Sequence, residues 1–132
     1  MKNILFVCVE NSNRSQMAEA FGHLHKTDNL QVYSAGSKPS GTINPKAIVA
    51  LGEKGIDTNK MFSKSLQEIP NTEYDAVISM GCGEDCPHIP AKIREDWLIP
   101  DPKNLSENEY RIIRDYIEIK VKELIQKIDN ND

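Results

Sequence analysis

The sequence has no apolar run that approaches the length of a membrane-spanning helix. Its first residues, MKNILFVCVEN, turn polar too early for a secretory signal, so we expect a cytoplasmic protein that does not enter a membrane. Positive charge is not in excess either, because the formal net charge is −4. General nucleic-acid binders are usually basic, so we expect no nucleic-acid partner. A small anion site stays compatible with this balance, because local fields outweigh net charge.

Cysteine is scarce: the 132 residues include three, Cys8, Cys82 and Cys86. An odd count does not suit a set of structural disulfides, and a reducing compartment would keep these side chains as thiols. A chain of this length can bury a core without a disulfide or a metal. The cysteines are therefore predicted to be reactive, and we expect no cofactor and no resident metal ion.

Internal repeats, low-complexity tracts and linkers are also absent, which predicts a single domain over residues 1–132. Apolar runs predict strands at residues 4–7, 30–34, 74–80 and 97–99. Helical periodicity predicts three helices. The first begins at Ser15, the second after Asn44-Pro45, and the third after a capping box formed by Ser106 and Glu109. Strands that alternate with helices predict an α/β domain with a parallel sheet.

Three candidate functional segments each follow a predicted strand. Cys8 ends the first strand, the loop GCGEDCPHIP follows the third, and Asp101 comes shortly after the fourth. Ligands of open parallel sheets bind beyond the carboxyl ends of the strands. We therefore expect these three segments to meet at one edge of the sheet.

Residues 8–15, CVENSNRS, join the first strand to the first helix, and we call them the cradle loop. Backbone N–H groups of such a loop and the N-terminus of the helix favour a bound oxyanion. Asn11, Ser12 and Asn13 suit tight turns, and the fork of Arg14 can hold two oxygens of a tetrahedral anion. The cradle loop is thus predicted to bind an oxyanion.

Cys8 stands at the base of the cradle loop, where the helix dipole and Arg14 would favour the thiolate. A thiolate beneath a bound oxyanion is a nucleophile directed at the central atom. Ser15 could donate a hydrogen bond to that thiolate when it leaves. In the alternative interpretation Cys8 is an inert buried thiol and Arg14 forms a surface ion pair, but the strand, loop and helix around them favour the functional interpretation.

The cradle loop resembles the C-x5-R-S/T loop of the low-molecular-weight phosphotyrosine phosphatase fold. The segments NSNRSQMAEAF, VYSAG, INPKAI and GID resemble more closely the thioredoxin-coupled arsenate reductases built on that fold. The resemblance implies a four-stranded parallel sheet flanked by helices, with Cys8 as nucleophile and Arg14 as anion grip. It implies that substrate is bound by residues of the cradle loop, namely Val9, Glu10, Asn11, Ser12, Asn13, Arg14 and Ser15, with Asn11 and Ser15 shaping the loop.

The cradle loop departs from this family at three positions. Many relatives carry glycine in its first half and a second cysteine just before the arginine, where this chain has Val9, Glu10 and Asn13. Because Glu10 is acidic beside an anion site, we expect its side chain to point outward.

Some relatives bind a potassium ion near the loop. Asn11, Glu19 and Ser34 match part of that site, but Lys64 stands where an acid is expected. We therefore predict no ion there.

The resemblance assigns the general acid to Asp101, which would protonate the leaving oxygen. Taken alone, Asp101-Pro102 is equally typical of an ordinary turn. Phosphatases of this fold often place tyrosines after the Asp-Pro pair, whereas Lys103 and Asn104 follow here. This difference disfavours a phosphotyrosine substrate.

Cys82 and Cys86 distinguish a reductase from a phosphatase, which needs one cysteine. The predicted relay passes from Cys8 to Cys82 and then to Cys86 by thiol–disulfide exchange, and Gly81 and Gly83 would let the loop move. Two alternatives are a zinc site completed by His88, for which no convincing fourth ligand is present, and a pair of incidental thiols.

The sequence as a whole predicts a monomeric arsenate reductase with arsenate as substrate and phosphate as its analogue. Thioredoxin or a similar thiol reductant would supply the electrons. One alternative is a phosphatase acting on phosphotyrosine or a small phosphate ester. A second is a non-catalytic oxyanion-binding or thiol-sensing module, which would need no Asp101.

Overall fold

Four parallel strands form one sheet in this computed structural model, which describes residues 1–81 and 88–130. They are β1 (Lys2–Cys8), β2 (Leu30–Gly36), β3 (Tyr74–Ser79) and β4 (Ala91–Asp96), in the spatial order β2-β1-β3-β4. The predicted α/β fold with a four-stranded parallel sheet is thus confirmed.

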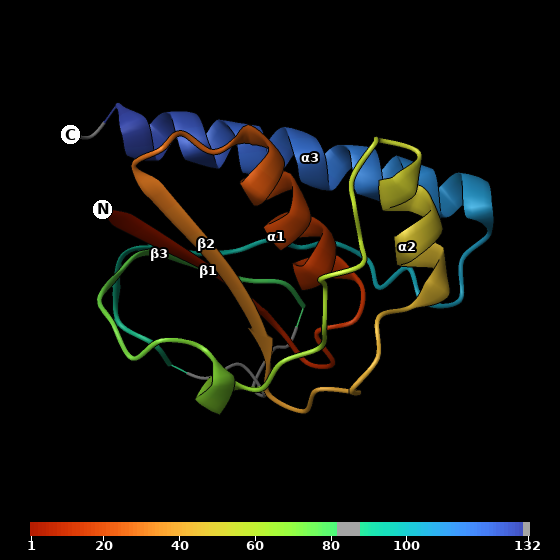
Figure 1. Cartoon of the computed structure of the whole chain (residues 1–132), viewed down its shortest axis with the longest axis horizontal. Coiled ribbons are helices and arrows are strands. Elements are labelled where there is room, and N and C mark those ends of the chain that lie inside the picture. The colour runs from red at the N-terminus through yellow and green to blue at the C-terminus, as the bar shows by residue number, and fades with distance from the viewer. Residues whose placement is uncertain (82–87, 131–132) are drawn as a thin grey trace.

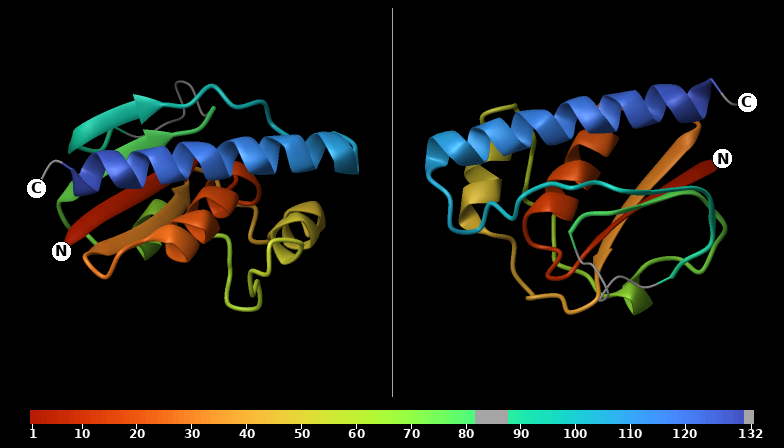
Figure 2. Two further views of the ribbon diagram at one scale, coloured as in Figure 1. Left: turned by 90° about the horizontal axis from the view of Figure 1, so that it is seen from above. Right: turned by 180° about the vertical axis from the view of Figure 1, so that it is seen from behind.

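Helices cover the sheet mainly on one side. These are α1 (Arg14–His25), α2 (Pro45–Gly52) and α3 (Glu107–Asp129), and a short 3-10 helix, η1, spans Leu66–Glu68. α1 and α3 lie against the same face, with α2 beside α3 (Figures 1 and 2). The opposite face is covered by η1 and by the segments that precede β3 and β4. No helix in the described ranges is both long and apolar enough to cross a membrane.

The buried central strand β1 fixes where Cys8 points. Its side chains alternate between the two faces, as a strand requires. Ile4, Phe6 and Cys8 join the core beneath α1 and α3, whereas Leu5 and Val7 join the smaller cluster on the opposite face. Cys8 therefore ends the strand with its sulfur on the helical side, next to the start of α1.

The predicted helix starts are confirmed by their hydrogen bonds. Asn44 Oδ1 accepts from the backbone N–H of Lys46, 2.9 Å away, at the start of α2. At the start of α3, Ser106 Oγ accepts from the N–H of Glu109 at 3.2 Å, and Glu109 Oε1 accepts from the N–H of Ser106 at 3.4 Å. The apolar stripe of α3 is buried as its spacing predicts: Ile113, Ile117, Val121, Leu124 and Ile128.

The strand predicted at residues 97–99 is wrong, because the fourth strand is β4, residues 91–96. The segment AKIRED alternates half-buried and exposed residues, as an edge strand can, so it lacks the apolar run that marks a buried strand. In the apolar segment that follows, Trp97 and Ile99 are buried but Leu98 is 87% exposed. That segment leads the chain from the sheet edge towards the cradle loop.

Candidate active site

A cavity of about 360 Å³ lies beyond the carboxyl ends of the central strands. Three segments line it: the cradle loop, the residue at the start of the loop after β3, and the Asp-Pro segment. The lining residues are Cys8, Val9, Glu10, Ser12, Asn13, Arg14, Gly81, Asp101 and Lys103. The predicted meeting of the three segments is confirmed for these residues, whereas Cys82 and Cys86 lie outside the residues that the structure describes.

Asn11 shapes the cradle loop from within and is fully buried. Its φ of 51° lies in the left-handed region, which asparagine tolerates better than most residues. Its side-chain oxygen accepts hydrogen bonds from the N–H of Lys64 at 2.8 Å and from Nε2 of Gln16 at 2.7 Å. These bonds hold the turn so that the N–H of Asn11 donates to Cys8 Sγ, 3.2 Å away.

Ser15 lies behind the thiol, with its Oγ 2.7 Å from Cys8 Sγ. Asn11 Nδ2 donates to Ser15 Oγ at 2.8 Å, so the side chains of Asn11 and Ser15 form one buried hydrogen-bonded group around the sulfur. Cys8 is 4% exposed, and its sulfur lies within hydrogen-bond distance of both the Asn11 N–H and the Ser15 hydroxyl.

Glu19 anchors the far end of this hydrogen-bond chain. The second N–H of Asn11 Nδ2 reaches Ser34 Oγ at 3.0 Å, and Ser34 donates to Glu19 Oε1 at 2.6 Å. Burial raises the pKa of Glu19, but hydrogen bonds from His23 and Ser34 and the charge of Lys64 outweigh it and leave that pKa below its ordinary value. Glu19 is therefore an ionised acceptor, which makes Ser34 the donor to Glu19 and leaves its oxygen to accept from Asn11 Nδ2.

Lys64 pairs with Glu19 beside the cradle loop, among the residues compared with a cation site in the sequence. Its ammonium nitrogen lies 3.1 Å from Glu19 Oε1, and its side chain is 10% exposed. Nζ also donates to the carbonyl of Phe62 at 3.1 Å. The negative charge of Glu19 thus has a cation from the chain itself. Among the described residues no group of three or more His, Cys, Asp or Glu side chains could hold a metal ion.

Arg14 begins α1 and reaches across the cavity to the segment after β4. Its Nη1 donates to the carbonyl of Ile99 at 2.8 Å, and its Nη2 lies 3.9 Å from Asp101 Oδ2. The arginine side chain is 12% exposed and the aspartate 52%. The predicted anion grip and the predicted general acid therefore face each other, and Asp101 is open to solvent for proton exchange.

Glu10 lies at the rim of the cavity, as expected for an acid beside an anion site. Its side chain is 40% exposed and pairs with Lys103, whose Nζ lies 3.3 Å from Glu10 Oε1. The N–H of Lys103 also donates to Asp101 Oδ1 at 3.1 Å. Lys103 thus connects the cradle loop with the segment that carries the predicted acid.

Tyr110 contributes to the site without having been predicted to do so. This residue in the first turns of α3 is buried, and its hydroxyl donates to Asn13 Oδ1 at 2.7 Å. Burial, and secondly the charge of Asp101, raise the pKa of Tyr110, so the phenol remains a neutral donor. A buried tyrosine usually needs a partner for its hydroxyl, but no local pattern indicates a partner that lies 97 residues away along the chain.

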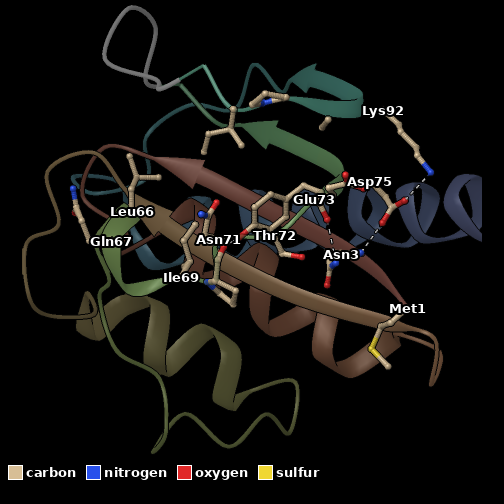
Figure 3. A pocket seen from close by; sticks show the side chains of 15 residues that line it. Met1, Asn3, Leu66, Gln67, Ile69, Asn71, Thr72, Glu73, Asp75 and Lys92 are labelled. Carbon is tan, nitrogen blue, oxygen red and sulfur yellow. Dashed lines mark hydrogen bonds and ion pairs between the residues drawn. The ribbon is translucent and has the colours of Figure 1, made fainter.

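A larger hollow of about 1260 Å³ lies on the opposite face of the sheet (Figure 3). Several of its polar groups pair with one another. Asp75 accepts from the N–H of Asn3 at 2.8 Å and pairs with Lys92 at 3.5 Å, and Asn3 Nδ2 donates to the carbonyl of Glu73. Among the described residues that line it there is neither cysteine nor histidine. The smaller cavity at Cys8 is therefore the better candidate for chemistry.

Known proteins resemble this chain along nearly all of its length. A glutaredoxin arsenate reductase of Synechocystis sp. is 37% identical over 131 residues, which cover 97% of this chain and 99% of the relative. A solved arsenate reductase in the phosphate-binding state shares 36% identity, with a TM-score of 0.85 and coverage of 97% and 99%. A solved thioredoxin-dependent arsenate reductase of Corynebacterium glutamicum is 32% identical with a TM-score of 0.80, and the match covers 100% of this chain and 64% of that one.

The family match agrees with these likenesses. Residues 3–132 match the family described as low molecular weight phosphotyrosine protein phosphatase. This range includes the cradle loop, the loop after β3 and Asp101. The chain therefore belongs to the low molecular weight phosphotyrosine protein phosphatase family.

Proposed function

We propose that this protein reduces arsenate to arsenite in the cytoplasm. The observation that carries the proposal is the position of Cys8: its sulfur lies at the floor of the cavity, with the N–H of Asn11 3.2 Å away and Ser15 Oγ 2.7 Å away. Relatives at 36–37% identity that cover nearly the whole chain are named arsenate reductases, which supports the choice of substrate.

In the first step the Cys8 thiolate attacks the arsenic of a bound arsenate. Arg14 holds the arsenate oxygens with N–H groups that are not used by Ile99, since a guanidinium has five donors. The hydroxyl oxygen of the bound hydrogen arsenate takes a second proton from Asp101 and leaves as water. Arsenic remains in its +5 state and is bonded to Cys8 Sγ.

In the second step Cys82 attacks Cys8 Sγ. A Cys8–Cys82 disulfide forms, and the electron pair of the sulfur–arsenic bond goes to arsenic, which becomes +3 and leaves as arsenite. Cys86 then attacks Cys82, so Cys8 is released as a thiolate and a Cys82–Cys86 disulfide remains. This relay rests on the sequence resemblance, because both cysteines lie outside the described residues.

Two electrons must come from outside to reduce the Cys82–Cys86 disulfide. We assign them to a small dithiol protein, either thioredoxin or a similar reductant. Of the relatives, one is named for glutaredoxin and another for thioredoxin dependence, so both donors belong in the test. Repeated arsenate reduction with purified thioredoxin and not with glutaredoxin, or the reverse, would identify the electron donor.

A weak phosphatase activity is the second candidate. The family description favours it, and phosphate resembles arsenate in shape and charge. The first step would be the same, with Asp101 protonating the ester oxygen, but water would then hydrolyse the phosphocysteine without any electrons. Lys103 and Asn104 after the Asp-Pro pair argue against phosphotyrosine as the main substrate.

Counting free thiols after a single arsenate turnover without reductant separates these functions. We expect the fully reduced protein to lose two thiols for each arsenite formed. A phosphatase, or a module that only binds oxyanions, would lose none. Cys8→Ser serves as the control, because a hydroxyl cannot replace the thiolate and the variant should form neither arsenite nor a disulfide.

A further inference from the structure

Gly81 is the second residue after β3, directly after Met80. It lines the cavity and lies against the side chain of Arg14. A Cβ atom on residue 81 would lie 3.0 Å from Cζ of Arg14 and 3.3 Å from Nη2, and closer still to Nη1. All three nearest atoms belong to the guanidinium group. The space that a side chain would need at this position is thus already filled by the arginine fork.

On another side the guanidinium is held by the segment after β4. Nη1 donates to the carbonyl of Ile99 at 2.8 Å, and the arginine side chain is 12% exposed. Arg14 therefore lies between Gly81 and Ile99. A side chain at residue 81 could be accommodated if the flexible end of Arg14 moved, which would cost the fold little but would take the fork out of its place.

We propose that Gly81 is the positioning residue of the anion grip: the absence of a side chain there creates the seat in which the Arg14 guanidinium faces the oxyanion. The inference rests on the role given to Arg14 under the proposed function. It makes the anion affinity of the cradle loop depend on a residue of a different loop, 67 positions further along the chain.

Gly81 also adopts a φ of +81°, so any substitution adds backbone strain. The chain offers a matched control in Gly55, which has a φ of +78° and no atom within 4 Å of its would-be Cβ. Gly55→Ala introduces the same strain without touching Arg14. Gly81→Asn complements Gly81→Ala, because asparagine tolerates positive φ better but still carries a Cβ.

The test measures the dissociation constant of inorganic phosphate by calorimetry, with thermal unfolding of each variant recorded alongside. Phosphate binding needs no electrons, so it is independent of Cys82, which directly follows Gly81. We expect Gly81→Ala and Gly81→Asn to weaken phosphate binding roughly tenfold to hundredfold, the loss of about one charge-assisted hydrogen bond. Gly55→Ala should bind as tightly as the wild type and melt at a temperature similar to that of Gly81→Ala.

A second comparison asks whether the effect passes through Arg14. In an Arg14→Lys background, which already lacks the fork, Gly81→Ala should weaken phosphate binding by less than twofold, so that the two changes are not additive. Additive losses would overturn the proposal, and so would wild-type affinity in both Gly81 variants.

The outcome is distinguishable from that of the proposed function. If the protein loses no thiols with arsenate but its phosphate binding depends on Gly81, the positioning role of Gly81 stands and arsenate reduction is refuted. If the protein loses two thiols but the Gly81 variants bind phosphate as well as the wild type, arsenate reduction stands and the positioning role of Gly81 is refuted. No phosphate binding by the wild type would overturn both, because Arg14 would then grip no anion.

Discussion

The ammonium nitrogen of Lys103 lies 3.3 Å from a carboxylate oxygen of Glu10, across the rim of the cavity that holds Cys8. One partner belongs to the cradle loop and the other to the segment of Asp101. A lone carboxylate at the rim would repel a dianionic substrate, and Lys103 offsets that repulsion. The pair explains how an acid is accommodated beside the predicted anion site.

Removing this cation should weaken the capture of arsenate. We expect Lys103→Ala to raise KM for arsenate roughly two- to fivefold, the range of an exposed ion pair, with a smaller effect at high salt. Steady-state kinetics at low and high ionic strength would measure this. Glu10→Gln in the same background should restore KM, because the uncompensated charge is gone. A double variant as impaired as Lys103→Ala would show that Lys103 acts on the substrate and not through Glu10.

Arg14→Lys tests the anion grip while keeping the charge. A lysine is a point charge that loses both the bidentate fork and the bond to Ile99, so we expect phosphate affinity to fall by about 1.5–3 kcal/mol, the value of a charge-assisted hydrogen bond. Calorimetric titration with phosphate gives this number. Arg94→Lys, an exposed change on β4, is the control and should leave affinity unchanged. Near-normal binding by Arg14→Lys would remove Arg14 from substrate binding.

Tyr110→Phe should destabilise the protein and loosen the cradle loop. The change leaves the buried Asn13 Oδ1 without its donor, which costs about 1–3 kcal/mol of unfolding free energy. Urea unfolding would measure the loss, and phosphate titration should show weaker binding because Asn13 lines the cavity. Tyr116→Phe on the exposed side of α3 is the matched control. Equal stability of the two variants would contradict this role.

Acid should weaken the contact between α2 and α3 through Glu53. Hydrogen bonds from Arg111 and, further, from Arg114 lower the pKa of Glu53 to about 2. Its unfolded value is about 4.3, so the ionised carboxylate stabilises the fold above that pH, and the contribution is lost as pH falls towards 2. We therefore expect the drop in urea midpoint between pH 7 and pH 3 to be smaller in Glu53→Gln than in the wild type. Glu123→Gln, exposed on α3, should behave like the wild type.

The features that local pattern determines could be predicted from the sequence. The buried run of β1, the caps at Asn44 and Ser106, and the meeting of Cys8 with Asp101 at one sheet edge all follow from periodicity, capping and the geometry of parallel strands. The edge strand β4 cannot be predicted in this way, because its charged residues resemble a loop more than a strand.

What could not be predicted are contacts between residues far apart in the chain. The hydroxyl of Tyr110 meets Asn13, and the guanidinium of Arg14 fills the space above Gly81. Each residue alone has an ordinary local interpretation, as a core aromatic or a turn glycine. Their roles depend on the distance between loops in the folded chain, which one sequence does not contain.

Cys86→Ser provides the sharpest test of the proposed relay. In that relay Cys86 never touches arsenate; it releases Cys8 from the first disulfide and presents a bond that an external reductant can reach. We therefore expect the variant to convert one arsenate per enzyme and then stop, whereas wild type continues with a dithiol protein as donor. Peptide mapping after acid quench should find a Cys8–Cys82 disulfide in the variant and a Cys82–Cys86 disulfide in the wild type. Exchange proceeds by attack of a thiolate on a disulfide sulfur, and a serine hydroxyl cannot make that attack. Repeated turnover of Cys86→Ser with thioredoxin as sole donor would remove Cys86 from the mechanism, and the reductant would then have to act directly on Cys82 or on the arsenylated Cys8.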